Sequence, residues 1–297
     1  MNEVVIISGA TCTGKTALAI DIAEKNNAEI ISCDSVQIYK KADIGSAKAS
    51  VEEQQRIRHH LIDVVNVDEI FDVATYVELA KKALQDITNR GKNVVVVGGS
   101  GFYLKSWFMA VADTIQIPKH ISDFASKIEE EGGAKALAIE LLKIDKLAAE
   151  TIDICNPRRT KNALERCLAT SKSVRQLRSE FEKLPCPMGE FPRKFVLLDV
   201  EDDKLFQRIT LRTNSMIENG LIEETKKLID LGILKNPSLK NSTGYKQAIE
   251  FIQNNSTDLQ RLKDDIAIQT MSLVRKQRKY FASQLKDIPR SALSSFL

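Results

Sequence analysis

The chain has 297 residues, of which 43 are Lys or Arg and 40 are Asp or Glu, so its formal charge is +3. This composition excludes a disordered chain and a bulk polycation, and no uncharged apolar stretch approaches the roughly 20 residues of a membrane span. The five cysteines show no CxxC spacing and the first residues do not resemble a signal peptide. We therefore expect reduced thiols in a cytoplasmic protein without membrane contact.

The N-terminal third alternates between short apolar runs and helical periodicity. We expect strands at Glu3–Ser8, Glu29–Cys33, Leu61–Val65 and Val94–Val97. We expect helices between them at Ala17–Lys25 and Tyr76–Asn89. Strands that alternate with helices predict a parallel sheet with helices on both faces.

The character of the sequence changes near Asp113, and the segment from Pro118 to Arg193 has little strand signal. Its periodicity predicts helices at His120–Glu131, Ala134–Lys143, Arg158–Thr170 and Val174–Leu184. A strand at Lys194–Val200 then precedes helices at Asp202–Asn219, Ile222–Asp230, Tyr245–Gln253 and Asp258–Leu285. The sequence predicts an α/β core of residues 1–112 and 191–297, interrupted by a helical insertion domain at residues 113–190.

A complete GxxxxGK[ST] motif lies between the first predicted strand and the first helix. It consists of Gly9, Ala10, Thr11, Cys12, Thr13, Gly14, Lys15 and Thr16. The backbone amides of such a P-loop bind phosphate oxygens, helped by the positive end of the following helix. Lys15 would neutralise the outer phosphate and Thr16 would hold Mg²⁺. The motif predicts a bound polyphosphate without specifying ATP.

Two other loops follow predicted strands. Asp34 ends the second strand, at the edge where parallel strands present their carboxyl ends to a ligand. By position alone it fits a helix cap as well as a catalytic or metal-binding carboxylate. In the loop Gly98–Gly101, Ser100 could donate a hydrogen bond to phosphate, or the loop could be a tight turn before a helix.

His59 and His60 are adjacent, so their side chains would point to opposite faces of a strand. No third ligand has suitable spacing, and we expect a structural or substrate-contacting role in preference to zinc binding.

Basic residues concentrate in two segments. Asn156–Lys183 contains eight Lys or Arg against three Glu, and the C-terminal helix adds Arg275, Lys276, Arg278 and Lys279. Charge runs are often only solvated faces, but two of them beside a phosphate-binding loop favour nucleic acid as a partner.

Taken together, these motifs resemble the tRNA dimethylallyltransferase (tRNA isopentenyltransferase) family. The similar stretches are the P-loop, Asp34–Tyr39, Asp43–Lys48, His59–Asp63, Gly98–Tyr103, Asn156–Glu165, Met216–Glu224 and Gly244–Lys246. They extend over nearly the whole chain in the family's order.

The resemblance implies a P-loop NTPase-like core and an insertion that grips the anticodon stem-loop of tRNA. The P-loop would hold the diphosphate of dimethylallyl diphosphate together with Mg²⁺. The exocyclic amine of the adenosine just 3′ of the anticodon would attack the dimethylallyl carbon, and diphosphate would leave. The base would have to leave the anticodon stack to reach the site. A monomer suffices for this chemistry.

The resemblance also implies roles for single residues. Asp34 would be the general base, which decides its role in favour of catalysis. Ser100, where the family has threonine, would donate to the leaving oxygen, and Lys15 and Arg212 would complete the catalytic set. The residues implied to contact tRNA are Asp34, Ser35, Val36, Gln37, Ser100, Arg158 and Arg159.

The chain departs from the family pattern mainly in the segments that read tRNA. The differing residues are Ser46, Ala49, Asn162, Thr213, Asn214, Met271, Lys279 and Tyr280. Such departures suggest a divergent or second copy of the enzyme.

Three alternatives remain open. An adenylate isopentenyltransferase would share the donor site but would not need an extended positive face. A P-loop small-molecule kinase would place Asp199 near Thr16, whereas prenyl transfer would place Asp34 near the P-loop. A non-catalytic RNA-binding protein would not account for the joint presence of Lys15, Thr16, Asp34 and Ser100.

Overall fold

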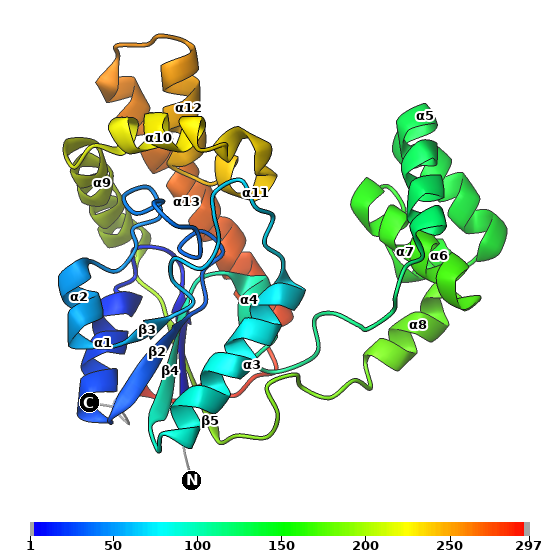
Figure 1. Cartoon of the computed structure of the whole chain (residues 1–297), viewed down its shortest axis with the longest axis horizontal. Helices are drawn as coiled ribbons and strands as arrows, with labels where there is room; N and C mark the ends of the chain where they lie inside the picture. The colour runs from blue at the N-terminus through cyan, green and yellow to red at the C-terminus, as the bar shows by residue number, and fades with distance from the viewer. Residues whose placement is uncertain (1–2, 294–297) are drawn as a thin grey trace. The chain divides into compact units, whose positions relative to one another are not determined.

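The structure is a computed structural model that describes residues 3–293 (Figure 1). The chain forms two compact units. The smaller is Ala112–Pro185, and the larger is formed by the described residues on either side of it. The larger unit contains the sheet, while the elements of the smaller unit are helices.

The sheet has five strands among the described residues, in the order β3-β2-β4-β1-β5. They are β1 (Val4–Gly9), β2 (Ala28–Ser32), β3 (His59–His60), β4 (Asn93–Gly98) and β5 (Arg193–Leu198). Every pair of neighbours is parallel, so the carboxyl ends of all strands lie at one edge. The predicted α/β class with a parallel sheet is confirmed.

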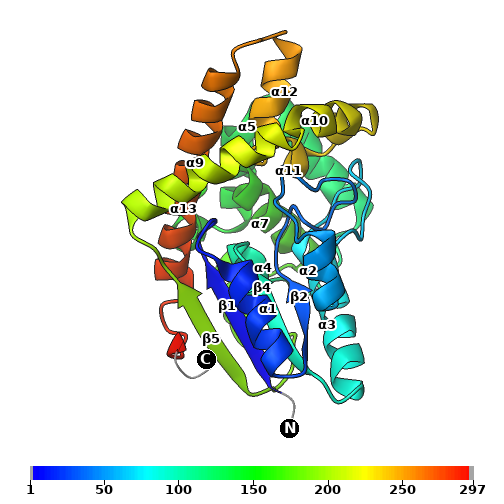
Figure 2. The ribbon, with the colours of Figure 1, turned by 90° about the vertical axis from the view of Figure 1, so that its left-hand side faces the viewer.

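The apolar strands bury both faces of the sheet. Val5 and Ile7 of β1 pack with helix α1 (Lys15–Lys25), which lies in front of the sheet in Figure 2. Val4 and Ile6, pointing the opposite way, pack with helix α3 (Val73–Asn89). Because each fully buried Val or Ile side chain contributes roughly 1.5–3 kcal/mol, this two-sided burial stabilises the sheet at whose carboxyl edge the P-loop begins.

The other helices of the larger unit follow the strands or come after β5. They are α2 (Val51–Arg56), α4 (Gly101–Lys105), α9 (Asp202–Glu218), α10 (Leu221–Asp230), α11 (Pro237–Lys240), α12 (Tyr245–Gln253) and α13 (Leu259–Gln284), with a 3₁₀ turn at Ile233–Lys235. Helices α9 and α13 pack through Leu205, Ile209 and Val274, and Ala10 of the P-loop belongs to the same cluster. The two helices therefore lie next to the P-loop.

The smaller unit has its own apolar core. It contains α5 (Lys119–Ile144), α6 (Ala148–Thr151), α7 (Pro157–Thr170) and α8 (Val174–Phe181). Leu137 and Leu141 of α5 pack with Leu164 of α7. Helix α5 is interrupted at Gly133, whose φ is +61°, at the boundary between the two helices expected there.

The expected strand Leu61–Val65 is wrong. The strand is His59–His60, and the chain then turns because Leu61 and Asp63 adopt φ values of +62° and +56°. This turn brings the Asp63 carboxylate 2.6 Å from the buried ammonium of Lys48. The short helices α2, α6 and α11 were not expected, because so few residues show no helical periodicity, whereas α4 is the helix that one interpretation of the Gly98–Gly101 loop placed after it.

None of the described helices combines the length and the apolar character that crossing a membrane requires.

Candidate active site

The P-loop joins β1 to α1 at the carboxyl edge of the sheet. The Lys15 Nζ donates to the Ala10 carbonyl at 2.6 Å, and Thr13 Oγ1 donates to the same carbonyl at 2.9 Å. Burial lowers the pKa of Lys15 to about 8; nearby Arg212 adds to this effect, and the Asp34 carboxylate opposes it. A phosphate bound at this loop would supply negative charge and so stabilise the ammonium form of Lys15.

A cavity of 550 Å³ lies over this loop, and we call it the P-loop cavity. It is lined by Thr11, Cys12, Gly14, Lys15, Thr16, Asp34, Gln37, His59, Arg208 and Arg212, among others. The remaining motif residues lie behind the lining: Ala10 and Thr13 are buried, and Gly9 ends β1 against Leu198.

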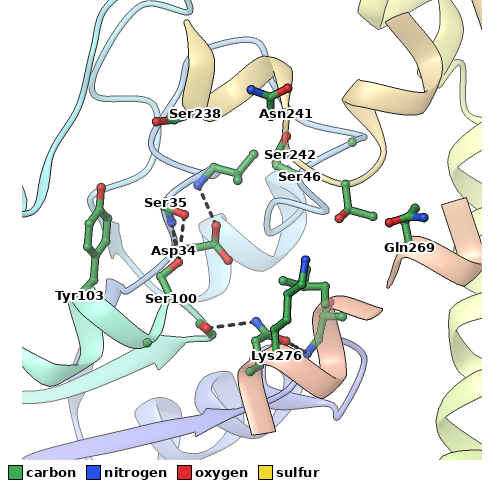
Figure 3. A pocket seen from close by; sticks show the side chains of 18 of the residues that line it. Asp34, Ser35, Ser46, Ser100, Tyr103, Ser238, Asn241, Ser242, Gln269 and Lys276 are labelled. Atoms are coloured by element: carbon green, nitrogen blue, oxygen red, sulfur yellow. Dashed lines mark hydrogen bonds between the residues drawn. The ribbon is translucent and has the colours of Figure 1, made fainter. Parts of the chain in front are cut away.

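A second cavity, of 660 Å³, lies on the other side of Asp34, and we call it the glycine-loop cavity (Figure 3). Its lining includes Ser35, Val36, Ser100, Tyr103, Ser238, Asn241, Ser242, Lys246, Gln269, Lys276 and Gln277. Both cavities are lined by Thr11, Asp34, Ser46 and Arg212. The two cavities therefore adjoin at these four residues, and a molecule in each would meet beside the Asp34 carboxylate.

The Asp34 carboxylate caps a local turn and also lines both cavities. Its Oδ1 accepts hydrogen bonds from the backbone N–H groups of Val36 at 2.8 Å and Gln37 at 3.4 Å. Both bonds use the same oxygen, so the carboxylate is fixed by a local turn while Oδ2 remains for a substrate. The bonds to Oδ1 thus orient the carboxylate and leave Oδ2 available to a substrate.

Ser100 is bonded to the segment that carries Asp34. Its Oγ accepts from the Ser35 N–H at 2.8 Å and donates to Ser35 Oγ at 3.1 Å. Ser100 occupies the N-cap position of α4, yet its side chain makes no capping bond there. The close approach depends on Gly98, where a Cβ would lie 2.0 Å from the Cys33 carbonyl oxygen.

Helix α9 presents two guanidinium groups to the P-loop. Arg212 Nη1 donates to Thr11 Oγ1 at 2.9 Å, and Arg208 Nη1 donates to the Cys12 carbonyl at 3.4 Å. Arg212 was predicted from the resemblance; Arg208 was not. Its signal is the spacing of four residues, which places both side chains on one face of a helix.

The wall contributed by α13 was also not predicted. The lining residues of this helix are Gln269, Leu273, Lys276, Gln277, Tyr280 and Phe281. Their spacing of three, four and seven residues follows one face of a helix, and this pattern could have shown a partly polar face turned toward the site. Figure 3 places Gln269 and Lys276 on this helix.

The position of Asp199 does not match the kinase alternative. Its carboxylate lies 2.8 Å from the Arg278 guanidinium and lines neither cavity. Asp34 instead shares the P-loop cavity with Lys15 and Thr16.

The oxygen groups in the P-loop cavity fit Mg²⁺ carried by a phosphate. Magnesium usually takes one or two protein ligands and keeps several waters beside substrate phosphates. The Thr16 hydroxyl and the Asp34 carboxylate line this cavity. Across the described residues, no cluster of three or more His, Cys, Asp or Glu forms an independent metal site.

The two histidines face different partners. His60 Nε2 lies 2.7 Å from the Glu29 carboxylate. Hydrogen bonds from Arg90 first, and then from His60 and Lys92, hold the pKa of Glu29 well below its usual range. His59 Nδ1 lies 2.8 Å from the Ile57 carbonyl, and the ring borders the P-loop cavity.

Many of the basic side chains predicted to contact nucleic acid form ion pairs with carboxylates of this chain. Within the basic segment Asn156–Lys183, the paired cations are Lys161, Arg166, Lys172 and Arg178. Arg158 and Arg159, at the start of α7, are exposed and have no ion pair within residues 3–293. In α13, Arg278 is paired with Asp199 and Asp202, so this helix offers fewer cations than its composition indicates.

One departure from the family pattern has a packing explanation. Met271, which stands where the family has arginine, is 9% exposed and lies on the face of α13 that packs with Leu205 and Ile209 of α9.

Comparisons with known proteins show the family to which this chain belongs. Residues 37–284 match the model of the IPP transferase family. The chain is 38% identical over 283 residues to the tRNA dimethylallyltransferase of Opitutus terrae, covering 95% of this chain and 90% of that protein. It is 39% identical over 261 residues to the tRNA dimethylallyltransferase of Acetivibrio thermocellus, covering 85% and 80% of the two proteins.

Solved structures are similar as well. The tRNA isopentenylpyrophosphate transferase of Bacillus halodurans is 32% identical, with a TM-score of 0.66 and coverage of 95% of this chain and 88% of that one. A eukaryotic dimethylallyltransferase described as acting on tRNA is 27% identical, with a TM-score of 0.83 and coverage of 95% and 70%.

Proposed function

Because the chain belongs to the IPP transferase family, we propose that it is a tRNA dimethylallyltransferase that uses dimethylallyl diphosphate. The observation that carries the proposal is the junction of two cavities at Asp34: one is lined by a phosphate-binding loop, the other by polar side chains. A donor and an acceptor entering from opposite sides would meet at a fixed carboxylate.

The P-loop cavity would take the diphosphate. Lys15, Arg208 and Arg212 contribute positive charge there, and the amides at the start of α1 contribute further donors. Mg²⁺, when bound through Thr16 and a phosphate, would neutralise charge on the leaving diphosphate. These groups stabilise the charge that accumulates as the carbon–oxygen bond breaks.

The glycine-loop cavity would take the extruded adenine of the tRNA. Its exocyclic nitrogen would bond to the dimethylallyl carbon while the bond from that carbon to the diphosphate oxygen breaks. Asp34 would accept the amine proton through Oδ2, held in place by the bonds to Oδ1. Ser100 would turn its hydroxyl from Ser35 Oγ to the leaving oxygen.

Arg158 and Arg159 support tRNA as the acceptor over a free mononucleotide. They are exposed, basic and without carboxylate partners among the described residues, which suits contact with a phosphate backbone. The five cysteines are all free thiols, in keeping with an enzyme of the cytoplasm. We propose that it works there as a monomer.

Incubation with labelled dimethylallyl diphosphate, Mg²⁺ and either tRNA or AMP tests the proposal. We expect label in tRNA on the adenosine 3′ of the anticodon, with release of diphosphate. Labelled AMP with unlabelled tRNA would instead assign the protein to the adenylate isopentenyltransferases. Phosphoryl transfer from ATP without prenyl transfer would assign the protein to the P-loop small-molecule kinases.

A further inference from the structure

The side chain of Gln277 joins the two loops that line the active site. Its Nε2 donates to the Gly99 carbonyl at 3.0 Å, and its Oε1 accepts from the Thr11 N–H at 3.0 Å. One carboxamide on α13 is thus bonded at the same time to the P-loop and to the loop that carries Ser100.

The two loops have no comparable connection through the backbone. Strands β1 and β4 pair in register as far as Ser8 and Gly98, and the ladder ends there. Beyond this pair the side-chain carboxamide of Gln277 bonds as a backbone peptide group would: it accepts from Thr11 of the P-loop and donates to Gly99 of the glycine loop. These two hydrogen bonds continue the pattern of the β1–β4 pairing and fix the spacing of the two loops by the size of one carboxamide.

The surrounding residues fit this arrangement. A Cβ at position 99 would lie 2.7 Å from Gln277 Nε2, so glycine is needed for the carboxamide to reach the loop. Thr11 is held from two sides, by Gln277 at its backbone and by Arg212 at its hydroxyl. Thr11 is also one of the four residues that line both cavities.

We propose that Gln277 is a positioning residue, which sets the width of the opening between the P-loop cavity and the glycine-loop cavity. The inference rests on the proposed function, since that opening is where donor and acceptor would meet. Reacting atoms need to lie about 3–3.5 Å apart, and a misplacement of about 1 Å can lower a rate on the order of 100-fold.

A wider opening would also admit water. A water oxygen would bond to the dimethylallyl carbon as the carbon–diphosphate bond breaks, and its proton would pass to solvent. The products would be dimethylallyl alcohol and diphosphate. Loss of the Gln277 bonds should therefore change how the donor is divided between tRNA and water, an effect that a purely structural role would not produce.

The experiment compares full-length wild type with Gln277→Met, Gln277→Glu and Gln260→Met. Methionine retains the length of the side chain and loses both hydrogen bonds, whereas glutamate can still accept from Thr11 but cannot donate to Gly99. Gln260 is an exposed residue of α13 outside both cavities, bonded to Asp264, and is the matched control. The measurements are prenylated tRNA, dimethylallyl alcohol, the kcat and KM for tRNA, and the affinity for inorganic pyrophosphate.

For Gln277→Met we expect kcat to fall about 10- to 100-fold. Pyrophosphate affinity should stay within about threefold of wild type, because the P-loop amides and Lys15 are retained. The share of donor recovered as alcohol should rise, Gln277→Glu should lie between, and Gln260→Met should match wild type.

Two results would overturn the inference alone: an active wild type with an unchanged Gln277→Met, or a loss of kcat matched by an equal loss of pyrophosphate affinity. If Gln277→Met does not fold, Gln277→Glu decides in its place. A wild type that prenylates no tRNA would overturn the proposed function, and this inference with it.

Discussion

At the scale of single residues, the two side chains proposed to act on the substrates are held in place by hydrogen bonds within the protein. Asp34 is fixed through Oδ1 and Ser100 through Ser35, so both reach the site already oriented. Such preorganisation lowers the cost of reaching the transition state.

Asp34→Asn should separate the two functions of this side chain. The amide oxygen can still accept from Val36 and Gln37, so stability should change little, while the loss of a general base should lower turnover by about 10²–10⁴-fold. Steady-state kinetics with tRNA, together with urea unfolding, measures both. Asp34→Ala is the control: it loses the cap as well and should be less stable by about 1 kcal/mol. Full activity in Asp34→Asn would mean that another group takes the proton.

Lys15 should bind a proton when diphosphate binds. Its pKa of about 8 in the free protein lies below the ordinary value of 10.5, so near pH 8.5 much of it is neutral, and a bound anion would favour the ammonium form. Calorimetry of pyrophosphate binding at this pH, in buffers that differ in ionisation enthalpy, should show net proton uptake. Lys15→Met should remove that uptake and weaken binding.

The sign of the stability effect follows from the same pKa. Between about pH 8 and pH 10.5 the unfolded chain holds the Lys15 proton and the folded chain has lost it. This group therefore makes the ligand-free protein more stable as the pH rises through that window.

In the calorimetry, proton release on pyrophosphate binding, or no proton exchange at all, would contradict the depressed pKa of Lys15.

At the scale of elements, a loop after β2 is shaped by a carboxylate distant in sequence. Glu224 of α10 accepts from the backbone N–H groups of Asp43, Ile44 and Gly45 at 2.8–3.1 Å, and from the Tyr245 hydroxyl at 2.6 Å. These bonds hold the loop that presents Ser46 to both cavities. Glu224 and Tyr245 belong to Met216–Glu224 and Gly244–Lys246, two of the stretches that carry the family resemblance.

Glu224→Gln should weaken this loop. Its amide nitrogen would replace an acceptor oxygen that now faces N–H donors, and losing charge-assisted bonds of this kind costs about 2 kcal/mol. We expect a lower urea midpoint and reduced turnover. Glu223→Gln changes the exposed neighbour on the same helix and should behave like wild type. Equal midpoints for the two variants would show that the loop holds its shape without the carboxylate.

The elements also show what could be predicted from the sequence. The P-loop, Asp34 and the glycine loop could be predicted because each lies within a few residues of a predicted strand. Gln277 was not, because its partner Thr11 is 266 residues away and only the fold brings them together. The strand expected at Leu61–Val65 failed for the same reason: the buried Lys48 binds Asp63 and favours a turn that apolar pattern alone does not reveal.

At the scale of the whole molecule, the proposed diphosphate site and the proposed contacts with the tRNA backbone lie in different units. Lys15 and its cavity belong to the larger unit, whereas Arg158 and Arg159 belong to the smaller one. The two activities should therefore respond separately to mutation.

Changing Arg158 and Arg159 together to Ala should weaken tRNA binding and leave pyrophosphate binding unchanged. Each lost phosphate contact should also make the slope of log affinity against log salt shallower by roughly 0.7–0.9. Filter binding across a salt series measures this slope. Arg178→Ala, which removes a cation already paired with Glu182, is the matched control and should change the slope less. A double variant with the wild-type slope would place the RNA contacts elsewhere.

The position of the smaller unit in the chain has a consequence for synthesis on the ribosome. Strand β1 lies between β4 and β5, but the 94 residues that separate Gly98 from Arg193 must be made before β5 exists. At 5–20 residues per second, one edge of β1 stays unpaired for roughly 5–20 s. An apolar open edge invites pairing with other chains, so the nascent protein should be most prone to aggregation, and most dependent on chaperones, in that interval.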